Sequence, residues 1–165
     1  MKKIAVLISG QGSNLQAIIE ACQTGFIPGR IVTVISNKID SFGLVRAKSA
    51  GIPSRVFLRQ DFTSNLDMDK AIGDYLEDLS VDLIVLAGYM KILTKPFTQR
   101  FAGKILNIHP SLLPNIQGYI LIKERLRMAT ANTVQPCILL MKRSMEALLY
   151  YKLKCLFSLA ILSRR

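Results

Sequence analysis

The sequence predicts an α/β fold, a Rossmann-like open parallel sheet with helices on both of its faces. Short apolar runs such as residues 4–8 are typical of strands that are buried on both faces. Segments with apolar residues at helical spacing lie between them, and strands alternating with helices form parallel sheets. The chain has 165 residues, 50% of them hydrophobic, which suits one domain with a core and excludes a mainly disordered protein.

The predicted elements follow one another through the first 108 residues. Strands are predicted at residues 4–8, 31–35, 55–58, 82–87 and 104–108. The first helix places Leu15, Ile18, Ile19 and Cys22 on one face and stops at Gly25. A second helix is expected at 42–50, before Gly51, and a third has Met68, Ile72, Tyr75, Leu76 and Leu79 along one side. Ligands of such sheets bind beyond the carboxyl ends of the strands.

The net charge of +11 is concentrated late in the chain. Residues 1–118 hold 13 Lys and Arg against 9 Asp and Glu, whereas residues 119–165 hold 9 against 2. The modest excess in the first part suits small anionic substrates, or serves solubility alone. A nucleic-acid partner is not expected, because Tyr150 and Tyr151 are adjacent rather than interleaved with the basic residues of the tail.

Composition also excludes several other classes of protein. Cys22, Cys137 and Cys155 are odd in number and lack metal-ligand spacing, so neither a disulfide framework nor a metal site is expected. No apolar stretch approaches the roughly 20 residues of a membrane span. The apolar run at 4–8 is too short for a signal peptide, so we expect a cytoplasmic protein without membrane partners.

A glycine-rich loop follows the first predicted strand. Gly10, Gly12, Ser13 and Asn14 lie at the start of the first helix, where main-chain N–H groups and the helix dipole favour an anion. Ser13 and Asn14 can add side-chain donors to a ligand or can cap the helix. The dinucleotide-binding fingerprint is not matched, since its third glycine is missing. The loop therefore predicts either a phosphate site or only a tight turn.

Asn107 and His109 end the last predicted strand. Residues two apart on a strand point the same way, and Pro110 keeps His109 extended. An amide donor beside an imidazole suits acyl transfer to an amine, because the amide stabilises an oxyanion and the imidazole moves protons. His109 is the only histidine, and a structural role is its alternative. Residues 86–93 end another strand, where Gly88 admits a flat ligand or simply turns a strand-to-helix corner.

Together these segments resemble the glycinamide ribonucleotide formyltransferases, which are folate-dependent enzymes of purine synthesis and one-carbon metabolism. The matching stretches lie within residues 2–118: 6–18, with its Gly-x-Gly-Ser-Asn loop, 36–38, 85–93, and 107–114, which reads Asn-Ile-His-Pro-Ser-Leu-Leu-Pro. The 107–114 motif occurs in other formyl transferases and in formyltetrahydrofolate hydrolases. The loop near the amino end narrows the choice to the purine enzyme or the hydrolase. The hydrolase usually has an extra amino-terminal domain, which we do not expect here because the motif region begins at residue 2.

The resemblance implies a role for each matching residue. Gly12, Ser13 and Asn14 would hold the ribose phosphate, and Met90, Lys91, Ile92 and Leu93 would line the pocket for 10-formyltetrahydrofolate. Asn107 would bind the formyl oxygen, and His109 would be the acid and base as the amine attacks. The implied partners are small molecules, glycinamide ribonucleotide and the formyl folate, and no metal is implied.

The sequence departs from the family at two places. Asn65 stands where the family often has an Arg that contacts folate, and no Asp follows Asp82, so the Asp that orients the histidine is missing. After Gly118 the composition becomes basic and Leu-rich. We expect residues 1–118 to be the formyltransferase core, incomplete at its carboxyl end. Residues 119–165 would be a tail that is not a domain.

Two interpretations of the tail remain open. Residues 145–162 could form one long basic helix. Alternatively, residues 119–165 are an out-of-frame translation, caused by loss of one base at the junction of Gly118 and Tyr119. In the shifted frame residues 144–148 permit Asp-Gly-Gly-Pro, the family's missing turn, and the codons of Met145 and Glu146 force its first glycine. We therefore expect weak or no activity, with a non-catalytic phosphate- or folate-binding remnant as the alternative.

Overall fold

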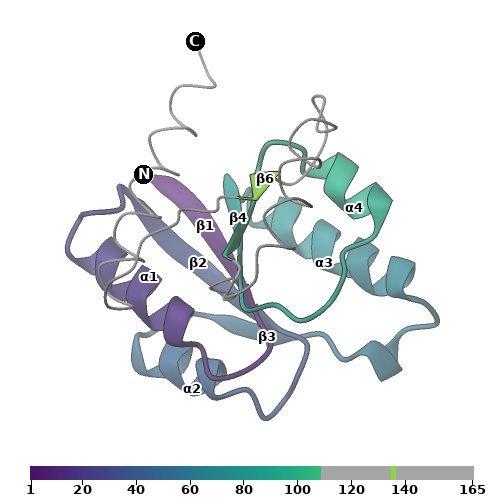
Figure 1. Cartoon of the computed structure of the whole chain (residues 1–165), viewed down its shortest axis with the longest axis horizontal. Coiled ribbons are helices and arrows are strands. Elements are labelled where there is room, and N and C mark those ends of the chain that lie inside the picture. Colours follow the sequence, from purple (N-terminus) through teal and green to yellow (C-terminus); the bar gives the residue numbers. More distant parts are fainter. Residues whose placement is uncertain (109–134, 137–165) are drawn as a thin grey trace, which may run out of the picture.

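The computed structural model of the chain describes residues 1–108 and 135–136 (Figure 1). Within this part every strand pair is parallel, and the sheet has the order β3-β2-β1-β4-β5-β6. The strands are β1 (Lys2–Ile8), β2 (Gly29–Ser36), β3 (Ser54–Val56), β4 (Leu83–Ala87), β5 (Ile105–Ile108) and β6 (Gln135–Pro136). The predicted open parallel sheet is confirmed.

The strand order creates one switch point in the sheet. The chain runs from β1 outward through β2 to β3, and then returns to the other side of β1 as β4. Connections on the two sides of β1 therefore diverge, and in open α/β sheets the carboxyl ends of the strands at such a point are where ligands bind. Leu7 of β1 pairs with Leu86 of β4, so the two strands end at the same level.

Helices cover both faces of the sheet, as predicted (Figure 1). α1 (Ser13–Gln23) and α2 (Phe42–Ser49) pack on the face that carries Val6 and Ile8. α3 (Asn65–Asp78) and α4 (Lys95–Arg100) pack on the face that carries Ala5 and Leu7. The alternation follows from the strand period of two, because successive side chains of β1 point to opposite faces.

Several observed elements differ from the predicted ones, and β1 and β2 each begin two residues earlier than predicted. β3 ends at Val56 rather than at residue 58, because the chain turns into a 3-10 helix at Arg59–Asp61. α4 was not predicted: it has six residues and buries only Phe97, too few to show a helical period. The two-residue strand β6 lies in the basic tail and pairs with β5. The helix predicted at 145–162 lies outside the described residues.

No helix within residues 1–108 has both the length and the apolar character that crossing a membrane requires.

Candidate functional site

The loop after β1 requires glycine at position 12 for two independent reasons. Gly12 has a φ of 70°, a left-handed conformation that side chains disfavour. A Cβ atom at Gly12 would lie 2.6 Å from the Cα of Gly43 in α2. The loop therefore passes against α2 at a separation that no side chain permits.

α2 holds this loop through the loop's carbonyl oxygens. The Ser41 hydroxyl and the Gly43 N–H both donate to the Gly10 carbonyl, at 2.8 and 3.1 Å. Arg46 Nε donates to the carbonyl of Gln11 at 3.0 Å. In a trans peptide group the N–H points opposite to the carbonyl. The next two N–H groups, those of Gln11 and Gly12, consequently face away from α2.

Ser13 and Asn14 open α1 but do not cap it. Gly12 is the N-cap residue, and no side chain makes a capping hydrogen bond. The alternative in which Ser13 or Asn14 caps this helix is therefore wrong. Ser13 is exposed and Asn14 is half-buried, which leaves both side chains beside the unpaired N–H groups of the first helical turn. The arrangement is typical of an anion site.

The loop after β4 exposes apolar side chains. Met90 and Ile92 are 72% and 95% exposed, whereas Leu93 is half-buried and packs against the core. Lys91 is half-buried. Gly88 has a φ of 75°, and nothing lies within 4 Å of the position that a Cβ would take there. The main chain and the apolar side chains of this loop are thus accessible to a flat ligand.

One hydrogen bond joins the two regions. The N–H of Met90 donates to the hydroxyl of Ser9 at 2.8 Å, and Ser9, 4% exposed, directly precedes the glycine loop. The structure therefore brings together two segments that are 81 residues apart in the sequence. They meet at the switch point, where ligands of open α/β sheets bind.

A buried carboxylate anchors the far end of the β4 loop. Asp69 of α3 is 2% exposed, and its Oδ2 accepts a hydrogen bond from the N–H of Thr94 at 2.7 Å. Burial, and after it the negative charge of Asp69, raises the pKa of Tyr89. Tyr89 therefore stays neutral at any physiological pH, and its ring packs in the core beneath the loop.

Asn107 lies on β5 beside the loop after β4. It pairs with Leu86 of β4 on one side and with Pro136 of β6 on the other, and it is half-buried. It is thus placed at the carboxyl ends of the central strands, as predicted. His109 lies outside the described residues, so its position beside Asn107 stays a prediction.

Sequence reasoning did not identify Ser9, Ser41, Arg46 or Asp69. Each contacts a loop from a distant part of the chain, and the hydrogen bonds span 25 to 81 residues. Such contacts leave no periodic signal. Asp69 in particular looks like an ordinary surface charge on a helix.

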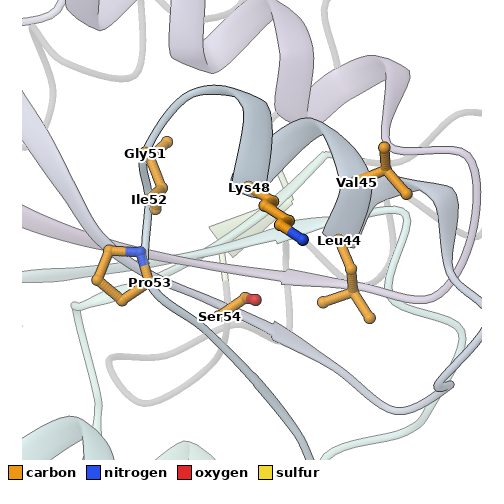
Figure 2. Close-up of a pocket in the computed structure, with 7 residues that line it drawn as sticks. All are labelled: Leu44, Val45, Lys48, Gly51, Ile52, Pro53 and Ser54. Atoms are coloured by element: carbon orange, nitrogen blue, oxygen red, sulfur yellow. The ribbon is translucent and has the colours of Figure 1, made fainter.

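A separate pocket lies between α2 and the start of β3 (Figure 2). It is an open depression of about 530 Å³, and its lining residues are Leu44, Val45, Lys48, Gly51, Ile52, Pro53 and Ser54. None of these is a predicted site residue. The pocket extends to the amino end of β3, whereas the two loops above follow the carboxyl ends of β1 and β4. It is therefore not the candidate site.

The chain matches the model of the formyl transferase family over residues 2–133. It is 74% identical over 118 residues to the phosphoribosylglycinamide formyltransferase of Haemophilus influenzae, which covers 72% of this chain and 56% of that protein. The corresponding protein of Escherichia coli is 49% identical over 115 residues, which covers 70% of this chain and 54% of the relative. The chain thus spans about half the length of these curated relatives.

Solved structures of similar proteins agree with the fold. Glycinamide ribonucleotide transformylase 1 from Symbiobacterium toebii superposes with a TM-score of 0.71 at 35% identity, covering 98% of this chain and 86% of that one. The phosphoribosylglycinamide formyltransferase from Brucella melitensis superposes with a TM-score of 0.67 at 35% identity and covers 98% and 92%.

Proposed function

The chain belongs to the formyl transferase family, and on that premise we propose that it is built to transfer a formyl group from 10-formyltetrahydrofolate to the amine of glycinamide ribonucleotide. This is a step of purine biosynthesis. The proposal includes a cytoplasmic location and small molecules as the only substrates.

The observation that carries the proposal is the contact between the two loops. The hydrogen bond from Met90 to Ser9 joins the apolar loop after β4 to the residue that precedes the glycine loop, and this contact supports two adjacent substrate sites. A reaction between a phosphorylated amine and a flat, largely apolar formyl donor needs both sites within one substrate length.

Each loop suits one substrate. Gly12, Ser13 and Asn14 would bind the ribose phosphate through main-chain N–H groups and short polar side chains. Met90, Lys91, Ile92 and Leu93 would line the pterin site. The fit is supported by the exposure of Met90 and Ile92 and by the open space at Gly88, since a pterin ring stacks on apolar surface and pairs with main-chain groups.

The chemistry would fall to Asn107 and His109. The amine nitrogen of the ribonucleotide attacks the formyl carbon, and a carbon–nitrogen bond forms while the bond from that carbon to N10 of the folate breaks. The Asn107 amide donates a hydrogen bond to the oxygen as it gains negative charge. His109 takes the proton released by the amine and returns one to N10 as it leaves.

The sequence of the tail bears on whether this chain catalyses formyl transfer. We retain the proposal that residues 119–165 are out-of-frame sequence and not a domain, and that the family's orienting Asp is therefore missing. A histidine without that carboxylate lacks the charge that raises its pKa and fixes its orientation. The second candidate function is accordingly substrate binding without turnover, which the absence of any Asp after Asp82 favours.

Calorimetry and a formyl-transfer assay on the full chain test both candidates. Binding of glycinamide ribonucleotide and of a non-reactive folate analogue, with turnover, supports the transferase. Binding of both without turnover supports the binding remnant, and release of formate from the formyl folate alone supports the hydrolase. If neither ligand binds, the proposed function is wrong.

The proposal about the tail has its own test. Sequencing the coding DNA from codon 115 through codon 148 should show that adding one base within codons 115–125 restores a family-like frame, with an Asp-Gly-Gly-Pro turn at the codons of residues 144–148. Absence of such a frame would refute it. The frame-corrected protein is also the matched control for the assay, because it shares residues 1–118 with this chain.

A further inference from the structure

The loop that follows β4 is fixed at two points by side chains from elsewhere in the molecule. Near its start, the Met90 N–H donates to Ser9 Oγ at 2.8 Å. At its end, the Thr94 N–H donates to Asp69 Oδ2 at 2.7 Å. We call residues 88–94 the β4 loop, and Ser9 and Asp69 its two anchors.

Both anchors are buried, although the loop itself is not. Ser9 and Asp69 are 4% and 2% exposed, while Met90 and Ile92, on the outer side of the loop, are 72% and 95% exposed. Tyr89, 9% exposed, packs in the core. The inner side of the loop is thus held in place, and its outer side presents apolar surface to a ligand.

The anchors lie on well-packed parts of the fold. Ser9 directly follows β1, which pairs on both sides with β2 and β4. The next residue, Gly10, is itself held by Ser41 through a hydrogen bond of 2.8 Å. Asp69 lies in α3 between Met68 and Ile72, which are both completely packed in the core.

A carboxylate at the position of Asp69 needs an explanation. A charge in the interior is unfavourable unless hydrogen bonds compensate it, and hydrogen bonds to a charged acceptor are about twice as strong as neutral ones. The hydrogen bond that the structure gives to Asp69 runs to the β4 loop. Asp69 therefore stabilises the β4 loop and not its own helix.

We infer that Ser9 and Asp69 are positioning residues, which hold the β4 loop in the one shape that accepts the pterin ring of the folate. The nature of the ligand rests on the proposed function. The anchors themselves touch no substrate. They fix the main-chain groups and the apolar side chains of the loop before the ligand arrives, so less conformational entropy is lost on binding.

The test is calorimetry on the full chain with a 5,8-dideaza analogue of the folate. Ser9→Ala and Asp69→Ala each remove one anchor, and each should raise the Kd of the analogue about tenfold. Asp69→Asn keeps an oxygen that accepts from Thr94 and should rescue binding to within about threefold. Glycinamide ribonucleotide should bind all variants with a Kd within about threefold of the unaltered chain.

The matched control is Thr33→Val. Thr33 is fully buried in β2, a strand that β1 separates from β4, and its hydroxyl lies 3.2 Å from that of Tyr75. This variant loses a buried hydroxyl, as Ser9→Ala does, but should leave the Kd of the folate analogue unchanged. A merely destabilised fold would shift the control and the anchor variants alike.

Hydrogen exchange gives a readout that needs no ligand. Ser9→Ala should speed exchange of the Met90 amide about tenfold, and Asp69→Ala that of Thr94, with the amides of β1 unchanged. Unchanged exchange overturns the inference, as does an unchanged folate Kd in both anchor variants. If the unaltered chain binds no folate analogue, the proposed function fails and the role in folate binding fails with it. Exchange then still decides whether the anchors hold the loop.

Discussion

The loop after β1 and the loop after β4 meet at the switch point of the sheet, yet they are held in opposite ways. α2 holds the first loop by its carbonyl oxygens, through Ser41, Gly43 and Arg46, so its N–H groups face outward. Ser9 and Asp69 hold the second by its N–H groups, at Met90 and Thr94.

The difference matches what each loop would bind. A phosphate needs several converging N–H groups and no side chain in the way, and the glycines of the first loop meet this need. A ring system needs apolar surface and a few main-chain groups, and exposed Met90 and Ile92 offer such a surface in the second. In each loop, the main-chain groups that hydrogen-bond to the rest of the protein are not available to a ligand.

The largest expected effect is on the rate of formyl transfer and not on the binding of substrates by the two loops. Asn107→Ala should lower turnover about 10²- to 10³-fold, because one oxyanion donor is lost, while both substrates keep their affinities. The measurement is a formyl-transfer assay. The substitution is made in the unaltered chain if that chain is active, and otherwise in the frame-corrected protein. A loss below about threefold would remove Asn107 from the mechanism.

The next effect compares the glycines of the two loops. Gly12→Ala should lower the free energy of unfolding by about 3 kcal/mol or more and abolish ribonucleotide binding, because a strained φ is combined with a contact of 2.6 Å to Gly43. Gly88→Ala is the matched control. It has nearly the same φ but open space, so it should cost only about 1–2 kcal/mol. Urea unfolding measures both, and equal losses would contradict the close approach of α2.

A smaller effect concerns the cation beside the first loop. Arg46→Met removes the hydrogen bond to Gln11 and a positive charge, and should raise the Kd of glycinamide ribonucleotide about fivefold. Arg46→Lys keeps the charge and should recover part of that loss. Calorimetry with the folate analogue should show no change. If it does change, the two loops are not supported independently.

The smallest effect concerns the core beneath the second loop. The Tyr89 hydroxyl is buried and has no hydrogen-bond partner among the described residues. Tyr89→Phe removes this unsatisfied group, and should leave the free energy of unfolding unchanged or raise it by up to about 1 kcal/mol. A loss of more than about 1 kcal/mol in urea unfolding would show that the hydroxyl has a partner.

Most of the sheet could be predicted from the sequence because each strand has a recognisable local pattern of apolar residues. The apolar run of β1 and the helical spacing of Leu15, Ile18 and Ile19 reflect burial that repeats every two or every 3.6 residues. α4 and β6 were not predicted because segments of six and two residues are too short to show a periodic pattern.

The sequence by itself determined which residues stand at the ends of the central strands. Each end can be recognised from nearby residues alone, because an apolar run stops there and a glycine or Asn107 marks the place. Only the tertiary structure decided which side of each loop faces a ligand. That choice depends on hydrogen bonds from Ser41 to Gly10 and from Met90 and Thr94 to Ser9 and Asp69. A hydrogen bond needs its two atoms about 3 Å apart, and only the folded chain brings such distant residues together.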